Sequence, residues 1–243
     1  MMKELWKTTK EQFIIAGNYL TTEEKRIHDS DEIVQMMAKE SKLQVNCAHF
    51  IKLFITFQQS IDLSFKTMNQ IADHYAHMLA SSSQKDTAQT IANVTSALSD
   101  LGKTMAVSRI QKYCLDPLIL YNSQCLKTLQ LGNSRHDAYI LKIKSDQSLA
   151  KLKAKTVNSE KISVKEKKNK VRNETFELAD KAFREAYAKD VYDSDILETT
   201  WKAFTFYLYQ INEELHIKYN EGISNSFPFD KFSPVFEPLS KVP

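Results

Sequence analysis

The densest run of chemically active side chains is basic and lies between residues 142 and 172. It contains ten lysines and one arginine: Lys142, Lys144, Lys151, Lys153, Lys155, Lys161, Lys165, Lys167, Lys168, Lys170 and Arg172. Only three acids share the run, so it carries a net charge of +8 while the whole chain carries +3. Lysines that reach an acidic membrane surface contribute about 1 kcal/mol each to binding. The run is therefore either a membrane-binding surface or the solvated face of a helix.

Side chains suited to catalysis or metal binding are scattered along the chain. Glu213 and His216 form one Glu-x-x-His motif, whereas di-iron helical bundles need two such motifs and two further glutamates. His74 and His77 lie one helical turn apart without an identifiable third ligand. Glycine-rich phosphate loops, H-E-x-x-H and Gly-x-Ser-x-Gly motifs are absent from the sequence. We therefore expect no enzyme, and neither a catalytic residue, a cofactor nor a metal site.

The composition predicts an all-helical protein. Among 243 residues there are only four glycines and five prolines, too few for the turns that a sheet requires. No run of about 18 apolar residues is present, so we expect no transmembrane helix. The basic run lacks interleaved aromatic residues and any nucleic-acid-binding motif, which argues against a nucleic-acid partner.

The three cysteines and the N-terminus indicate a cytoplasmic protein. Cys47, Cys114 and Cys125 form no C-x-x-C pair and occupy apolar helical positions, as expected of buried thiols in a reducing compartment. Charged residues interrupt the first eleven positions, so the N-terminus does not match a secretory signal.

Residues 1–20 form a short amphipathic segment. Its apolar positions include Met2, Leu5, Trp6 and Phe13, and lysines and glutamates occupy the other face. Such a helix can lie in the headgroup plane with its apolar face inserted. The alternative is that it begins the first long helix and packs on protein.

The first long helix is expected over residues 21–79, beginning at a capping box of Thr21 and Glu24. Its apolar residues recur at steps of three and four, and about 58 residues would extend roughly 90 Å. Further apolar positions widen this seam between Phe50 and Phe65. A helix that is apolar on more than one side needs cover from more than one side, which favours a second chain.

Two more long helices are expected. The second begins near Thr87 and is kinked at Pro117, with a further bend at Gly132. A turn over residues 156–163 leads to a third helix over residues 164–219, which begins at a capping box of Ser163 and Glu166. The proline- and phenylalanine-rich tail is either a strap on the bundle or a partner-binding segment.

Three antiparallel helices leave surplus apolar surface on the first helix, the start of the second and the end of the third. A two-fold homodimer would cover this surface and leave one basic tip at each end. The predicted dimer residues are Phe50, Phe54, Phe57, Ile61, Leu98, Leu101, Trp201, Phe204, Leu208 and Ile211.

Several motifs in this order resemble the BAR domain (Bin/amphiphysin/Rvs) family, most nearly its N-BAR amphiphysin, endophilin and Rvs branch. They are Leu-Asp-Pro at residues 115–117, Arg-His-Asp-Ala-Tyr at 135–139, and the Trp201 and Phe206-Tyr207 run over 196–207. Residues 10–17, followed by Thr-Thr-Glu-Glu-Lys, are similar to the N-terminal helix of that branch.

The resemblance implies an elongated antiparallel three-helix coiled-coil bundle with a kinked second helix, paired into a crescent-shaped dimer. On this interpretation residues 1–20 are the amphipathic helix, 21–223 the BAR domain and 224–243 the tail. The dimer would bind acidic phospholipid through its basic tips and concave face and sense or generate curvature, as in endocytosis at plasma or endosomal membranes. The alternative is a helical scaffold that binds a small GTPase, or an adaptor through its tail, without bending membranes.

Overall fold

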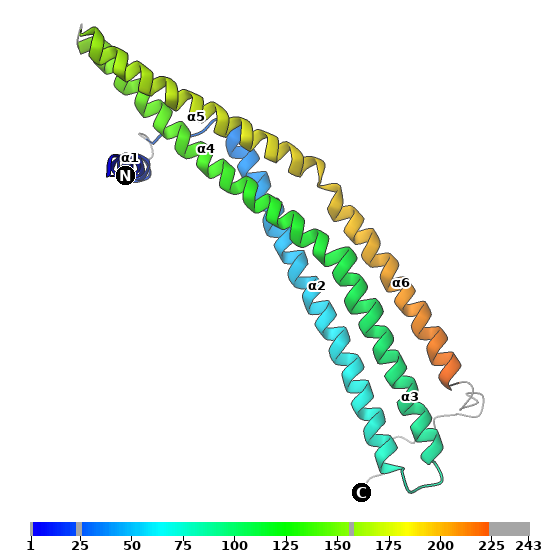
Figure 1. Cartoon of the computed structure of the whole chain (residues 1–243). Helices are drawn as coiled ribbons and strands as arrows, with labels where there is room; N and C mark the ends of the chain where they lie inside the picture. Colours follow the sequence, from blue (N-terminus) through cyan, green and yellow to red (C-terminus); the bar gives the residue numbers. More distant parts are fainter. Residues whose placement is uncertain (1, 23–25, 156–157, 224–243) are drawn as a thin grey trace, which may run out of the picture. The chain divides into compact units, whose positions relative to one another are not determined.

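All regular structure in the described part of the chain is helical, as the composition predicts. The computed structural model describes residues 2–22, 26–155 and 158–223 (Figure 1). In chain order the helices are α1 (Met2–Tyr19), α2 (Asp31–Met78), α3 (Lys85–Gly102), the π-helical segments η2 (Lys103–Arg109) and η3 (Gln111–Leu115), α4 (Asp116–Lys155), α5 (Ser159–Tyr192) and α6 (Asp195–Ile223).

The chain divides into two compact units, each built from three long helical segments. Unit 1 comprises Met1–Ala48 and Leu120–Asp195, and unit 2 comprises His49–Ile119 and Ile196–Pro243. Unit 1 therefore contains α1, the first part of α2, most of α4, and α5. Unit 2 contains the rest of α2, together with α3, η2, η3 and α6, which run side by side (Figure 1).

The first long helix begins ten residues later than expected. Instead of starting at a Thr21 capping box, α2 begins at Asp31, with Asp31 and Glu32 in its first turn. The Thr21 hydroxyl donates to the Asn18 carbonyl at 2.6 Å and so caps the end of α1. Because α1 is a separate helix, the alternative that residues 1–20 simply begin the long helix is wrong.

The second helix remains helical through Pro117, as predicted, but with a change of hydrogen-bonding pattern. Segments η2 and η3 have the wider π-helical turns, and the Asp116 N–H donates to the Gln111 carbonyl five residues back. A proline ring crowds the carbonyl four residues before it, here that of Tyr113. The π-turn of η3, which contains Tyr113, therefore lies where an ordinary α-helical turn would meet the Pro117 ring.

The third helix starts earlier than expected and is divided. Asn158 caps α5, because its side-chain oxygen accepts the Lys161 N–H at 3.0 Å; Ser163 and Glu166 lie within the helix instead of starting it. The helix stops at Tyr192, and α6 begins at Asp195. At this break the Ser194 hydroxyl donates to the Val191 carbonyl at 2.7 Å, a local bond that competes with helix continuation.

The core of unit 1 fills the space between α2, α4 and α5. Its fully buried hydrophobic side chains include Ile33, Cys47, Tyr121, Cys125, Ile140 and Phe183. Gly132 lies against Met37 of α2 and Phe183 of α5, so a β-carbon there would collide with the Met37 sulfur. The close approach of α2, α4 and α5 therefore explains this glycine. Helix α4 continues through it without interruption.

The core of unit 2 is one apolar cluster between α2, η3, α4 and α6. Its buried members are Phe54, Ile110, Cys114, Leu115, Leu118 and Ile211. The Phe204 ring meets Phe54 edge-on at 5.0 Å and Phe57 at 5.3 Å between centroids. All three cysteines of the chain are free and buried, which confirms the sequence prediction.

Candidate membrane-binding surface

The basic run lies on an antiparallel hairpin formed by the end of α4 and the start of α5, within unit 1 (Figure 1). Contacts between the two helices fix its register. Asn169 donates to Asp146 at 2.9 Å, and the Lys153 ammonium lies 2.6 Å from the Glu166 carboxylate. One feature of the fold therefore gathers the eleven basic residues that the sequence singled out.

The hairpin does not expose all of these side chains equally. Exposed residues are Lys151, Lys153, Lys155, Lys161, Lys167, Lys168 and Lys170. Half-buried residues are Lys142, Lys144, Lys165 and Arg172. Seven of the eleven side chains are thus exposed to solvent.

Two of the half-buried residues make contacts within the protein. The Lys142 ammonium lies 4.8 Å from the centroid of the Phe176 ring. Arg172 donates to the Leu141 carbonyl at 3.1 Å and lies 3.4 Å from the Glu11 carboxylate, with 11% of its side chain exposed. These contacts indicate that Lys142 and Arg172 hold the hairpin together and add little to a lipid contact.

The two edges of α5 differ in charge. One edge borders a groove of about 720 Å³ whose lining includes Glu166, Glu174 and Glu177. The other borders a groove of about 490 Å³ between α4, α5 and α1, whose lining includes Lys168 and Arg172 together with the acids Glu11 and Asp137. With Lys170 also in its lining the first groove is net acidic, whereas acids and bases balance in the second.

An apolar stripe crosses the basic surface, and the sequence analysis missed it. Val164, Val171 and Leu178 are 66%, 55% and 71% exposed. Positions seven apart lie on the same side of a helix, so the three form a row along α5. The seven-residue spacing within a lysine-rich segment is the signal that could have revealed it.

Helix α1 is fixed to unit 1 at its C-terminal end. Asn18 is buried and pairs with Ile27 twice: its side-chain oxygen accepts the Ile27 N–H at 2.9 Å, and its amide donates to the Ile27 carbonyl at 3.3 Å. The Tyr19 ring lies 6.0 Å from the His136 ring, and burial followed by the charge of Asp137 raises the pKa of Tyr19.

The side chains predicted to insert into the membrane are described only in part. Phe13 is 74% exposed. Met2, Leu5 and Trp6 lie outside the residues whose side chains the structure describes, so their insertion stays a prediction.

Unit 2 contains the residues predicted for dimer contact, but several of them face its own core. Phe54, Leu98 and Ile211 are buried within the chain. Phe57, Ile61, Leu101, Phe204 and Leu208 are half-buried. Phe50 and Trp201 are exposed, at 41% and 58%, and remain the predicted residues most open to a second chain.

A larger exposed apolar surface lies at the end of α2. Met68, Ile71, Tyr75 and Met78 continue the apolar seam and are 42%, 62%, 59% and 66% exposed. Three of them line an apolar groove of about 310 Å³ with Ala88 and Ile91 of α3. Such a contiguous apolar surface is characteristic of an interaction site.

Comparisons with known proteins identify the fold. Neither the protein-family models nor the curated proteins contain a match to the sequence. Among solved structures, the chain is similar to the amphiphysin BAR domain from Drosophila, with a TM-score of 0.64 and 14% identity over 84% of this chain and 97% of that chain. The chain therefore has the BAR domain fold, as its motifs predicted. Within the described ranges, no helix combines the length and hydropathy needed to cross a bilayer.

Proposed function

We propose that this chain binds acidic phospholipid membranes as a homodimer and senses or generates membrane curvature. The exposed lysines of the α4–α5 hairpin, on a chain with the BAR fold, are the observation that carries the proposal. They need no headgroup pocket, because the attraction comes from the summed surface charge of the leaflet. We therefore expect a dependence on lipid charge with weak headgroup selectivity.

Apolar contacts add to this attraction. The Val164, Val171 and Leu178 row projects from the same hairpin, and Phe13 of α1 is exposed in the same unit. Apolar side chains that enter the headgroup region leave water, and this stabilises the bound state by roughly 25 cal/mol per Å² of buried apolar surface. The lysines would draw the hairpin to the membrane, and these residues would then hold it there.

The exposed apolar surface of unit 2 supports the proposed dimerisation. The exposed row on α2 and its groove with α3 offer apolar surface that a second chain would cover. A stable interface buries on the order of 1,000 Å² or more. Pairing through unit 2 would give each dimer two unit 1 hairpins, and two attached hairpins bind more tightly than one.

Sedimentation with vesicles tests the charge mechanism. The variant changes four exposed hairpin lysines to glutamate, namely Lys151, Lys155, Lys161 and Lys167. At about 1 kcal/mol each, losing them weakens binding by up to about 4 kcal/mol per chain, roughly a thousandfold. The Lys153–Glu166 and Arg172–Glu11 ion pairs stay intact.

The matched control changes four exposed lysines of unit 2 to glutamate: Lys52, Lys66, Lys103 and Lys112. Both variants alter the net charge equally, so a general charge effect would weaken both. We expect the control to retain most of the binding to vesicles that contain phosphatidylserine. Equal binding by the wild type and the hairpin variant would refute the proposed surface. Electron microscopy of the same vesicles reports whether the bound protein forms tubules.

A further inference from the structure

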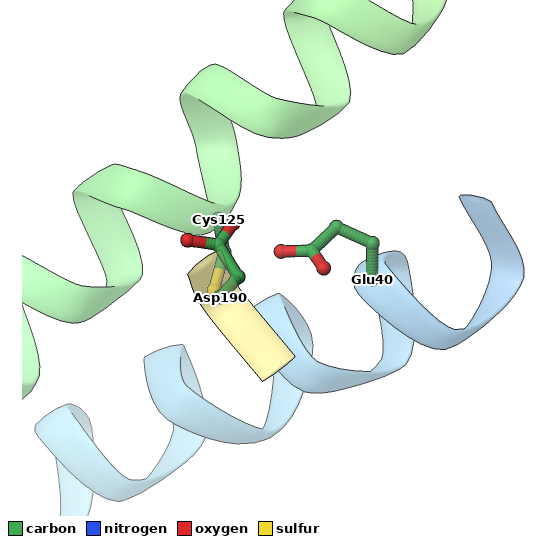
Figure 2. A group of neighbouring side chains, drawn as sticks. All are labelled: Glu40, Cys125 and Asp190. Carbon is green, nitrogen blue, oxygen red and sulfur yellow. The ribbon is translucent and has the colours of Figure 1, made fainter. Parts of the chain in front are cut away.

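Three buried side chains from three helices converge inside unit 1. Glu40 of α2, Cys125 of α4 and Asp190 of α5 are 1%, 0% and 2% exposed. A carboxylate oxygen of Glu40, the Cys125 sulfur and a carboxylate oxygen of Asp190 all lie within 4.8 Å of one another. Figure 2 shows the Glu40 carboxylate directed toward the other two side chains.

One oxygen of the Glu40 carboxylate is not satisfied by the surrounding protein. Its Oε1 atom is buried and has no hydrogen-bond partner in the described part of the chain. Burying a carboxylate without partners costs several kcal/mol, so such groups are normally paired or bound to a metal. Cys125 and Asp190 lie close enough to Glu40 to share hydrogen bonds with it, and the other group that acts on Cys125 is the thiol of Cys47. The cluster is thus rich in electron-pair donors.

Asp190, by contrast, is held in position from outside the cluster. The Thr128 hydroxyl donates to its Oδ2 atom at 2.5 Å, and the Tyr121 hydroxyl donates to its backbone carbonyl at 2.7 Å. Hydrogen bonds of this kind orient the carboxylate ligands of metal sites and are needed for full metal affinity. The cluster therefore offers three metal-binding groups: the oriented Asp190 carboxylate, the Glu40 carboxylate with one unpartnered oxygen, and the Cys125 thiol. A cation would complete this arrangement.

We propose that Glu40, Cys125 and Asp190 bind a Zn²⁺ ion that links α2, α4 and α5. Zinc accepts thiolate and carboxylate ligands at about 2.0–2.3 Å and is usually four-coordinate. The thiolate favours zinc over magnesium and calcium, which prefer sites made only of oxygen. A water molecule would take the fourth position.

The alternative occupant is a proton. Burial, and after it the charge of Asp190, raises the pKa of Glu40 to about 7, so a neutral Glu40 would also reduce the charge of the cluster. The two occupants differ in a measurable way. A metal site requires the Cys125 sulfur as a ligand, whereas a protonated Glu40 requires only the two acids.

Cobalt provides a direct probe of the proposed site. Tag-free full-length protein is freed of metal with a chelator and titrated with Co²⁺, because cobalt bound to thiolate absorbs in the near ultraviolet. We expect one Co²⁺ per chain, displaced by Zn²⁺, and a higher melting temperature when zinc is present. Metal analysis of the protein as purified should show about one zinc per chain.

Matched variants decide the assignment. Cys125→Ser and Glu40→Gln should lose the cobalt band and the zinc-dependent rise in melting temperature. Cys114→Ser, which removes a buried thiol of unit 2, should keep both. Thr128→Val should keep the band but bind roughly 10- to 100-fold more weakly. No cobalt band in the wild type, or a band that survives in Cys125→Ser, would overturn the proposal, and the first outcome would leave the proton as the occupant.

Discussion

Replacing Arg135 with methionine should destabilise unit 1 strongly. The Arg135 side chain is only 6% exposed and bridges two carboxylates: its Nη1 pairs with Asp29, and its Nε lies 2.5 Å from the Asp180 carboxylate. Methionine fills a similar volume without the charge. It would leave Asp29, which is 10% exposed, with only the His136 ring as a partner, and Asp180 with only Arg184. Removing one partner of a buried ion pair typically costs about 3–5 kcal/mol, a large part of the usual 5–15 kcal/mol stability of a protein.

The pH dependence gives the prediction a second readout. Burial raises the pKa of Asp29, but hydrogen bonds from His136 and Arg135 more than offset it, so the pKa of Asp29 lies below its usual value. The pKa of Asp180 is lowered in the same way by Arg135 and Arg184. A lowered carboxyl pKa stabilises the fold above the unfolded-state pKa of about 3.9, and this stabilisation is lost as the pH falls through the folded-state pKa. The loss caused by Arg135→Met should therefore be greatest near neutral pH and shrink in acid.

Urea unfolding followed by circular dichroism measures the effect, with all samples at one protein concentration. Arg184→Met is the matched control, since Arg184 contacts Asp180 and Glu32 in the same network but its side chain is 42% exposed. An exposed ion pair contributes little, so the control should lose much less stability. Equal losses in the two variants, or a loss for Arg135→Met that grows in acid, would refute this account of the network.

Three further predictions concern packing, dimerisation and the N-terminal helix. Gly102→Ala should cost about 1–3 kcal/mol in urea unfolding because its β-carbon would collide with the Phe65 ring, whereas Gly17→Ala, with nothing within 4 Å, should cost nothing. Ile71→Glu places a charge in the apolar groove of unit 2 and should shift the chain from dimer to monomer in light scattering; an unchanged mass would exclude this surface. Deleting residues 1–16 should reduce vesicle tubulation more than vesicle binding if the helix acts as a wedge, and equal losses would contradict that role.

The sequence predicted the fold because helical periodicity and the scarcity of glycine and proline are long-range signals. The predicted helix ends were less accurate, because several polar residues near each end can cap a helix equally well. Ser163 with Glu166 satisfies the capping-box pattern, yet Asn158 is the residue that caps α5. The break before Asp195 was not predicted, because the apolar repeat continues on both sides of it.

The sequence predicted which segment carries the candidate site, but not which of its side chains are exposed. Charge counting located the hairpin, but it could not distinguish exposed Lys167 from Arg172, whose partner Glu11 lies 161 positions away in the sequence. The same limit applies to Glu40 and Asp190, which the fold brings together across 150 residues. Partners brought together only by packing leave no spacing pattern that a sequence could show.

Arg135 is buried whereas the seven hairpin lysines are exposed, and we expect their positive charges to have different roles for this reason. Arg135 belongs to a motif that carries the family resemblance, yet its charge is directed inward, to Asp29 and Asp180. Its contribution is to stability and should be almost insensitive to salt, because buried pairs are poorly screened. The exposed lysines would act across solvent, so their proposed attraction to lipid should weaken as salt shortens the Debye length. Salt should therefore release the protein from vesicles while leaving unit 1 folded.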